Sequence, residues 1–477
     1  MKIKLGMQPM TLAQAAAYCG GELYDFTGCA GVEFSYICTD SREADKDTMF
    51  VAIRGERVDG HDYIGQAIAA GCRCFLCEYV PGEICAKHVG AAVVEDSVAA
   101  FCQLAKSYRI EKFGDRDPMR TVAVTGSVGK TTTKEMVAAV LRQEINLYTA
   151  QGNFNSEIGM PMSLMSAGAH HRAAVLEMGM SARGEISRMS RTACPTVAMI
   201  TNVGSSHLEY LGTRENIAAA KLEVADGLRH GGYLLLNADE PLLAGKHAEG
   251  RRTVYIGIDN PEADVRAENI RYTADGCTVF DLHTRHEVRT DVRIPALGRH
   301  MVMAALFAAV TGKIFHLSDA QIREGILSYQ AAPMRQQIER VGNVTLLCDC
   351  YNASPESMRA ALHALLELPV KGRRYAVLGD MLELGTQSAM LHEQVGMAAA
   401  QNVDVLLTVG TLGAHIAEGA RKVGGCEVHA FVGEDAKKQA AQALCELLAP
   451  EDALLLKASR GMRLEEIYQT VKQHLSE

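Results

Sequence analysis

The chain has 477 residues, a formal net charge of -9 at pH 7 and a hydrophobic content of 48%. This length is enough for about three domains of about 150 residues each. The acidic balance argues against nucleic acid as a partner, because a phosphate backbone requires clustered Lys and Arg. We therefore expect small-molecule partners.

The sequence contains neither a signal peptide nor an apolar run of about 18 residues that would predict a transmembrane segment. Its 14 cysteines fit free thiols in a reducing cytosol better than disulfides. Cys72, Cys74 and Cys77 lie in a strand-like run without a second cluster of suitable spacing, so we interpret them as free thiols and not as metal ligands. A cytoplasmic location is expected.

Prolines interrupt the periodic sequence at Asp117-Pro118 and near Pro333, which predicts domains at residues 1–118, 119–331 and 332–477. The first segment is typical of a small α/β domain, with strands at 36–38, 49–53 and 74–78 and a helix at 64–70. The middle segment alternates helices with strands at 121–124, 173–176, 197–201 and 233–237, which indicates a parallel sheet.

The third segment alternates strands and helices still more regularly, from VTLLCDC at residue 344 to a last helix. This pattern predicts a Rossmann-like, doubly wound sheet. Its GTLGAHIAEG stretch follows a strand, but its glycine spacing does not match a dinucleotide turn, so a nicotinamide site is not expected. The fold class is α/β with three domains.

The most informative stretch is AVTGSVGKTTTKEMVAAVL, from Ala123 to Leu141. It places a glycine-rich turn, G-x-x-G-K-T, between a strand and an amphipathic helix, which predicts a phosphate cradle. Gly126 and Gly129 can adopt backbone conformations closed to other residues. Lys130 can reach the outer phosphates, and the Thr131 hydroxyl can bind magnesium. The alternative is an ordinary glycine-rich turn.

Polar residues that end the parallel strands are expected at the same sheet edge as the cradle. Glu177 ends AAVLE and is a suitable magnesium ligand. His207 follows AMITNVGSS and is either a ligand or a loop residue. Lys221 lies in the helical stretch ENIAAAKLEVADGL, where a lysine usually solvates a helix face.

The motifs of the middle segment resemble those of the Mur ligase superfamily in order and spacing. They are TGSVGKTTTKE, GNFNSEIGMPMSL, LEMGMSARGEI, TNVGSSHLEYLGT with ENIAAAKLE, and NADE. In the third segment, DCYNASPESMRAAL, VLGDMLELG and LLLKASRGMRLE resemble the branch that adds D-alanyl-D-alanine to UDP-N-acetylmuramoyl-tripeptide. The resemblance covers nearly the whole chain.

This resemblance implies an ATP-dependent amide ligase of peptidoglycan synthesis that works through an acyl phosphate. It implies ATP and two Mg²⁺ ions as cofactors, a carbamate on Lys221, and a monomer. The catalytic residues would be Lys130, Glu177, His207 and Lys221. Thr131, Glu177, His207 and the Lys221 carbamate would bind the metal ions.

The resemblance also implies three binding sets. ATP would contact Gly126, Ser127, Gly129, Lys130, Thr131, Thr132, Asn237, Asp239, His300, Arg335 and Asp349. The UDP-muramoyl peptide would contact Ser41, Arg42, Asn155, Ser156, Arg183 and Glu185. D-alanyl-D-alanine would contact Tyr351, Asn352, Ser354, Asp380, Glu383, Lys457, Ser459 and Arg460.

The sequence departs from the family pattern in the adenine motif H-N-x-x-N, where Met301 and Ala304 replace the asparagines. Cys348 and Ser354 replace an aspartate and an asparagine in the third-domain signature. The alternatives are another Mur ligase, a folylpolyglutamate synthase or, in a different class, a regulatory P-loop protein that binds ATP without ligation.

Overall fold

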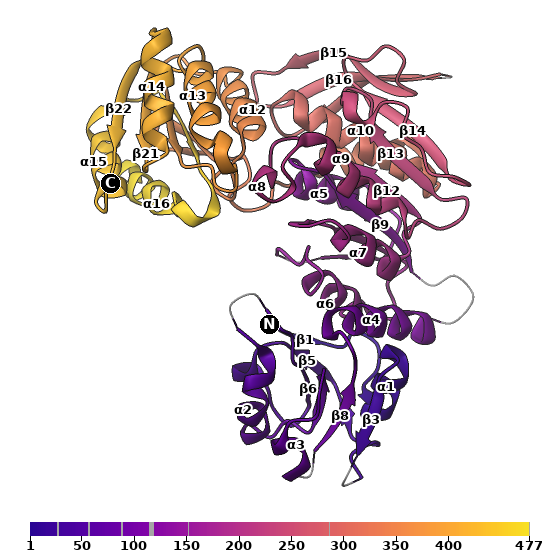
Figure 1. Ribbon diagram of the computed structural model, residues 1–477. Helices are drawn as coiled ribbons and strands as arrows, with labels where there is room; N and C mark the ends of the chain where they lie inside the picture. The colour runs from indigo at the N-terminus through magenta and orange to yellow at the C-terminus, as the bar shows by residue number, and fades with distance from the viewer. Residues whose placement is uncertain are drawn as a thin grey trace.

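The computed structural model describes residues 1–25, 28–55, 58–86, 89–113, 119–150, 152–285 and 287–476. The described residues form three large sheets with helices packed on them (Figure 1) and one separate two-stranded sheet. The predicted boundary at Asp117-Pro118 lies outside the described residues. The one near Pro333 falls in the connection between the last helix of the middle sheet and the first strand of the third sheet. None of the described helices has the length and apolar character needed to cross a bilayer.

The first sheet has the strand order β1-β5-β6-β7-β8-β3, with β1 and β3 antiparallel at its edges. Its strands are β1 (Lys2–Lys4), β3 (Glu22–Asp25), β5 (Tyr36–Cys38), β6 (Thr48–Val51), β7 (Cys74–Cys77) and β8 (Gly90–Val93); β2 (Met10–Thr11) and β4 (Glu33–Phe34) form a separate pair. The helices are α1 (Leu12–Cys19), α2 (Ile64–Ala69), α3 (Gly82–Ala86) and α4 (Ser97–Phe113). Cys72, Cys74 and Cys77 are buried free thiols.

The second sheet has the order β10-β11-β9-β12-β13-β14-β15-β16-β17. Its parallel strands are β9 (Arg120–Thr125), β10 (Leu147–Thr149), β11 (Ala173–Glu177), β12 (Val197–Ile200), β13 (Tyr233–Asn237), β14 (Arg252–Gly257) and β15 (Val265–Tyr272). The pattern did not predict the antiparallel extension through β16 (Thr278–Thr284) and β17 (Val288–Ile294). The first four residues of β15 alternate between buried and partly exposed positions, as a strand with one solvated face requires.

Helices cover both faces of the second sheet. One apolar cluster joins the sheet to α5 (Lys130–Leu141), α10 (Arg299–Ile314) and α11 (Asp319–Leu327). A second cluster joins the opposite face to α6 (Gly159–Met165), α7 (Glu185–Ala193) and α9 (Arg214–Leu222), while α8 (Leu208–Leu211) contributes Leu208. Met162 and Met165 of α6 also enter the core of the first domain, which ties the two domains together.

The third sheet has the order β18-β19-β23-β20-β21-β22, with β18 antiparallel at the edge, so the predicted doubly wound sheet is confirmed. Its strands are β18 (Gln337–Val341), β19 (Val344–Cys348), β20 (Arg374–Gly379), β21 (Val405–Val409), β22 (Glu427–Phe431) and β23 (Ala453–Lys457). Its helices are α12 (Pro355–Leu366), α13 (Ser388–Ala399), α14 (Gly413–Val423), α15 (Ala436–Leu447) and α16 (Glu465–Ser476).

Candidate active site

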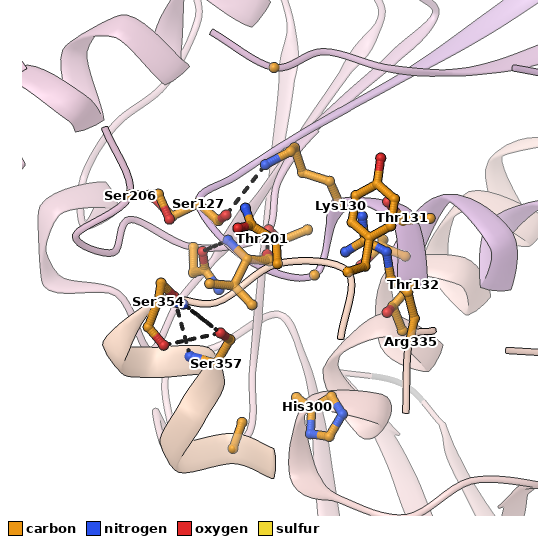
Figure 2. A pocket seen from close by; sticks show the side chains of 18 of the residues that line it. Ser127, Lys130, Thr131, Thr132, Thr201, Ser206, His300, Arg335, Ser354 and Ser357 are labelled. Atoms are coloured by element: carbon orange, nitrogen blue, oxygen red, sulfur yellow. Dashed lines mark hydrogen bonds between the residues drawn. The ribbon is translucent and has the colours of Figure 1, made fainter. Parts of the chain in front are cut away.

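A cavity of about 500 Å³ lies between the middle and third domains. Figure 2 shows the cradle residues Ser127, Lys130 and Thr131 on one side, with His300, Arg335 and Ser354 contributed by other segments. The cavity is therefore built from both domains. The sequence-predicted residues that line it are Ser127, Gly129, Lys130, Thr131, Thr132, Asn155, Ser156, Glu177, Glu185, His207, Asn237, His300, Arg335, Asp349, Tyr351, Asn352, Ser354 and Lys457.

The glycine-rich turn joins β9 to α5 as predicted. Gly126 has φ 151° and Gly129 has φ 81°, both in the region that favours glycine. The first helical hydrogen bond runs from the Thr133 N–H to the Gly129 carbonyl. The N–H groups of Lys130 and Thr131 before it therefore have no helical acceptor and form, with the positive end of the helix, a site for an anion.

Two other amides of the turn are already bonded within the protein. The Ser127 N–H donates to the Asn202 carbonyl at 3.2 Å, and the Val128 N–H donates to Asn202 Oδ1 at 2.9 Å. The Ser127 and Val128 amides are therefore bound to Asn202 and do not face a phosphate. Asn202 instead holds the shape of the turn. This contact joins two separate loops, so no local sequence pattern predicts it.

Lys130 folds back on the turn that carries it. Its Nζ donates to the carbonyls of Gly126 at 2.7 Å and of Ser127 at 3.3 Å. Burial lowers the pKa of Lys130, and the nearby Glu177 partly opposes this shift. The amine thus lies within the cradle, among acceptors that phosphate oxygens can replace.

Glu177 at the end of β11 is buried and accepts two hydrogen bonds. Thr131 Oγ1 donates to its Oε2 at 2.8 Å, and Asn155 Nδ2 donates to its Oε1 at 3.0 Å. The predicted carboxylate and hydroxyl ligands of a metal ion therefore lie side by side, and they are hard oxygen donors of the type that Mg²⁺ prefers.

His207 precedes α8 in a left-handed backbone conformation, with φ 66°. Its Nδ1 lies 2.9 Å from Glu383 Oε2 of the third domain, without the alignment of a hydrogen bond. This contact is the main reason why the pKa of Glu383 is lowered. Glu383 itself is not among the residues that line the cavity.

Lys221 is on the buried face of α9 and is only 2% exposed. In the described part of the chain, no hydrogen bond or ion pair involves its amine. Burial is the largest cause, and the nearby Lys130 the second, of a pKa well below the usual lysine value. Lys221 therefore does not solvate a helix face; it is a buried amine that favours the neutral form.

The part of the cavity around His300, where the resemblance predicts ATP contacts, is lined mainly by apolar residues. Met303, Ala304 and Ile258 line it, whereas Met301 points into the core. His300 Nε2 lies 2.6 Å from Gln336 Oε1, and burial lowers the pKa of His300. The sequence reasoning missed Ile258 and Gln336, since neither belongs to a recognisable motif.

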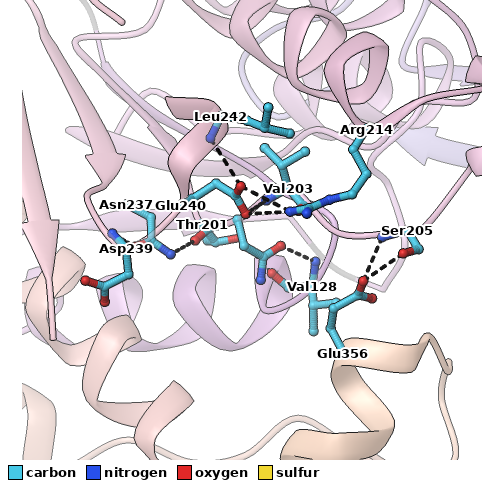
Figure 3. Close-up of polar contacts among 11 residues, drawn as sticks. Val128, Thr201, Val203, Ser205, Arg214, Asn237, Asp239, Glu240, Leu242 and Glu356 are labelled. Atoms are coloured by element: carbon cyan, nitrogen blue, oxygen red, sulfur yellow. Dashed lines mark hydrogen bonds and ion pairs between the residues drawn. The ribbon is translucent and has the colours of Figure 1, made fainter. Parts of the chain in front are cut away.

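Asp239, predicted to contact ATP, does not face the cavity. Its carboxylate accepts from the backbone N–H groups of Ile258 at 2.7 Å, Asp259 at 3.0 Å and Asn260 at 2.8 Å. It holds the loop after β14 and is not among the cavity-lining residues. Asn237 does line the cavity and donates to the Thr201 carbonyl at 2.8 Å (Figure 3).

In the third domain, Lys457 and Asp349 form a buried ion pair. Lys457 Nζ donates to Asp349 Oδ2 at 2.6 Å and to the Asn352 carbonyl at 2.9 Å. Arg335 lies 4.1 Å above the ring of Tyr351, so the two side chains orient each other by a cation–π contact. Ser354 caps α12, because its Oγ accepts from the Ser357 N–H.

Replacement of Lys457 by methionine is expected to destabilise the third domain strongly. The Lys457 side chain is 2% exposed and that of Asp349 12% exposed. The variant therefore leaves the Asp349 carboxylate buried without its positive partner. Loss of one partner of such a pair costs about 3–5 kcal/mol. Urea unfolding measures the change; the Lys457→Met, Asp349→Leu double variant should recover most of the loss, and a single variant as stable as wild type would contradict the prediction.

Three residues predicted to bind the dipeptide have contacts within the domain. Asp380 Oδ1 accepts from the Gly413 N–H at 2.7 Å, at the start of α14. A carboxylate of the protein thus occupies the position where the GTLGAHIAEG turn would hold an anionic cofactor. Ser459 Oγ accepts from the Leu382 N–H at 2.9 Å, and Arg460 pairs with Glu465 at 2.6 Å. The structure places these three side chains outside the cavity lining.

The residues predicted to bind the UDP-muramoyl peptide are spread over two domains. Ser41 donates to Gln66 at 2.8 Å, and the exposed Arg42 pairs with Asp40, whose pKa falls to about 2. Arg183 donates to Asn216 at 2.7 Å and lines a second cavity together with Glu185. Ser41 and Arg42 lie outside both cavities.

The comparisons with known proteins cover nearly the whole chain. Family models match residues 33–109 (Mur ligase family, catalytic domain), 124–312 (Mur ligase middle domain) and 334–460 (Mur ligase, glutamate ligase domain). The chain is 38% identical over 434 residues to the UDP-N-acetylmuramoyl-tripeptide–D-alanyl-D-alanine ligase of Bacillus subtilis, covering 90% of this chain and 92% of the relative.

Two solved structures extend this likeness to the fold. MurF from Acinetobacter baumannii superposes with a TM-score of 0.87 at 29% identity, covering 98% of this chain and 99% of that one. MurF ligase from Thermotoga maritima, solved in complex with ADP, superposes with a TM-score of 0.80 at 27% identity, covering 92% and 97%.

Proposed function

The chain belongs to the Mur ligase family, and we propose that it joins D-alanyl-D-alanine to UDP-N-acetylmuramoyl-tripeptide, giving UDP-N-acetylmuramoyl-pentapeptide for peptidoglycan synthesis. ATP is the energy source and is converted to ADP and phosphate. One observation carries the proposal: the phosphate cradle of the middle domain and the Asp349–Lys457 motif of the third domain line one cavity.

The chemistry requires two successive transfers. The terminal carboxylate of the tripeptide attacks the γ-phosphorus of ATP, which forms an acyl phosphate and releases ADP. The amine of D-alanyl-D-alanine then attacks the acyl carbon, loses a proton, and displaces inorganic phosphate. Lys130 and the free N–H groups at the start of α5 stabilise the negative charge that the first step concentrates on the phosphoryl oxygens.

We propose that Mg²⁺ is held by Thr131, Glu177 and His207. The buried Glu177 carboxylate, with Thr131 as its neighbour, fits the oxygen ligands that this ion requires. When bound, the ions would neutralise phosphate charge. Among the described residues, no three His, Cys, Asp or Glu side chains gather as a metal site, so Glu177 and His207 require a further anionic ligand for a second ion.

A carbamate on Lys221 would supply that ligand. Carbon dioxide reacts with neutral amines: the nitrogen lone pair attacks the carbon, and the amine loses a proton. The lowered pKa of Lys221 supplies the neutral amine. The product carries a negative charge that attracts the nearby Lys130, whereas a protonated Lys221 would be repelled by it.

The domain roles and binding sets are proposed in the same way. Residues 1–118, with Ser41 and Arg42, would bind the UDP sugar; residues 119–331 would bind ATP; residues 332–477 would close over ATP and bind the dipeptide. Asn155, Ser156, Arg183 and Glu185 would contact the muramoyl peptide. Tyr351, Asn352 and Ser354 line the cavity and would receive the dipeptide.

We also propose a monomer in the cytoplasm. The free cysteines support this compartment, because a reducing environment keeps such thiols unpaired.

Phosphate release from ATP tests the function. The full chain is expected to release phosphate only when UDP-N-acetylmuramoyl-tripeptide and D-alanyl-D-alanine are both present, with the pentapeptide product identified by mass spectrometry. Turnover with D-glutamate, a diamino acid or a folate with glutamate would assign the chain to another amide ligase. ATP hydrolysis without either substrate would indicate a regulatory ATPase.

A further inference from the structure

The segment from Gly204 to Glu209, which we call the His207 segment, belongs to the middle domain but is contacted at both ends by the third domain. At its first end, the Ser205 N–H and Oγ donate to Glu356 Oε1 at 3.0 Å and 2.9 Å (Figure 3). A Cβ at Gly204 would lie 2.9 Å from the carboxylate carbon of Glu356. The two domains therefore meet closely here, and a larger residue at position 204 would push the Glu356 carboxylate away.

Glu356 is held for this contact by its place in α12. It is the second residue of the helix, after Pro355 and the cap Ser354. A carboxylate is stabilised at a helix N-terminus by the unpaired N–H groups of the first turn.

At the other end, Glu383 approaches the same segment with both side chain and backbone. Its Oε2 lies 2.9 Å from His207 Nδ1, and its carbonyl accepts from the Glu209 N–H at 3.4 Å. A Cβ at Gly385 would lie 3.2 Å from Glu209 Cα, so the backbones approach closely.

The backbones of His207 and Glu383 are both left-handed, with φ 66° and φ 64°. Such conformations cost about 1–3 kcal/mol outside glycine and persist where the surrounding structure holds them. Here the two residues face each other across the domain boundary, so neither domain alone supplies all the contacts that hold them.

We propose that Glu356 and Glu383 are positioning residues that set the His207 segment when the third domain docks on the middle domain. Ser206 and His207 of this segment line the cavity. Docking of the third domain would therefore also set the shape of the cavity wall. The inference rests on the proposed function, in which His207 is a metal ligand. A carboxylate on the second nitrogen of such a histidine orients its ring.

Hydrogen exchange of the full chain without ligands tests the contact directly. Glu356→Ala is expected to speed exchange of the Ser205 amide about tenfold, because its acceptor is lost. Glu356→Gln keeps an acceptor oxygen and should restore most of the protection. Glu383→Ala keeps the backbone carbonyl that accepts from the Glu209 N–H but removes the carboxylate that contacts His207. Exchange at Glu209 should therefore speed because the segment loses its side-chain contact. Glu434→Ala, an exposed position on the same domain, makes the same charge change and should leave both amides as in wild type.

Turnover gives the second measurement. Glu356→Ala and Glu383→Ala are expected to lower kcat about 10- to 100-fold and to raise the Mg²⁺ concentration for half-maximal activity, with KM for the UDP-tripeptide nearly unchanged. Glu434→Ala should have the wild-type kcat, KM and Mg²⁺ dependence.

Wild-type exchange at Ser205 and Glu209 in both alanine variants would overturn the inference. So would a loss of kcat with unchanged exchange, since the glutamates would then act on substrate. If the wild-type enzyme does not turn over D-alanyl-D-alanine, the proposed function fails, while the exchange result still decides whether the glutamates hold the segment. If Glu356→Ala does not fold, Glu356→Gln and Glu383→Ala carry the test.

Discussion

Lys221→Met is expected to abolish ligation while making the fold more stable. The Lys221 amine is buried without a partner among the described residues and close to Lys130. Methionine keeps an unbranched chain of similar length and removes the polar group, which should raise the free energy of unfolding by about 1–3 kcal/mol. Without an amine no carbamate can form, so kcat should fall at least about 10²-fold.

The stability gain of Lys221→Met is expected to increase as the pH falls. Because the folded-state pKa of Lys221 is lowered, the unfolded chain binds a proton that the folded chain lacks at pH values between the two pKa values. The wild-type free energy of unfolding therefore falls as pH falls from about 10, the ordinary lysine pKa, toward the lowered one. The advantage of the methionine variant should grow over that range, measured by urea unfolding in buffer depleted of carbon dioxide.

Two control variants separate the role of the Lys221 amine from the effect of removing any lysine or of keeping a positive charge. Lys371→Met removes an exposed lysine of the third domain and should change neither stability nor turnover. Lys221→Arg keeps a positive charge but cannot be carbamylated, so it should be inactive. Wild-type protein in ¹³C-bicarbonate should give a carbamate NMR signal that both Lys221 variants lack. Normal turnover of Lys221→Arg would refute the carbamate.

Gly126→Ala is expected to damage the phosphate cradle. At Gly126, φ is 151°, and an added Cβ would lie 1.9 Å from Thr201 Oγ1. Thr201 must then move, although its Oγ1 donates to the Val128 carbonyl at 2.6 Å and so helps to shape the turn. A displacement of about 1 Å in such a site lowers kcat/KM about 10²-fold. Steady-state kinetics with varied ATP measures the loss.

Gly245→Ala is the matched control, because Gly245 has φ 69° but open space around its Cα and lies outside the cradle. It should show the backbone penalty in stability with normal kinetics. Thr201→Ala combined with Gly126→Ala should recover part of the activity by removing the hydroxyl that clashes. Wild-type ATP kinetics in Gly126→Ala alone would mean that the cradle tolerates the displacement.

The sequence predicts best those parts of the site whose residues are neighbours in the chain. The cradle was predictable, because the strand, the glycines and the helix that form it are neighbours in the chain. Glu177 was predictable for a related reason: a residue that ends a parallel strand lies at the ligand edge of the sheet, and Thr131 indeed donates to it. The antiparallel strands β16 and β17 were missed. The first five residues of β16 are all buried, and most residues of β17 are exposed or partly exposed, so neither follows a strict two-residue alternation.

The sequence by itself determined the phosphate cradle, the alternation that builds two parallel sheets, and the motifs that resemble a ligase family. Only the tertiary structure decided what the polar residues contact. In the folded chain Asn202 accepts from the cradle turn, and the Asp380 carboxylate lies at the start of α14. Lys457 pairs with Asp349, and Glu383 contacts His207. These contacts join loops of separate elements or domains, and a side chain's burial and partners depend on how those elements pack, which no local pattern records.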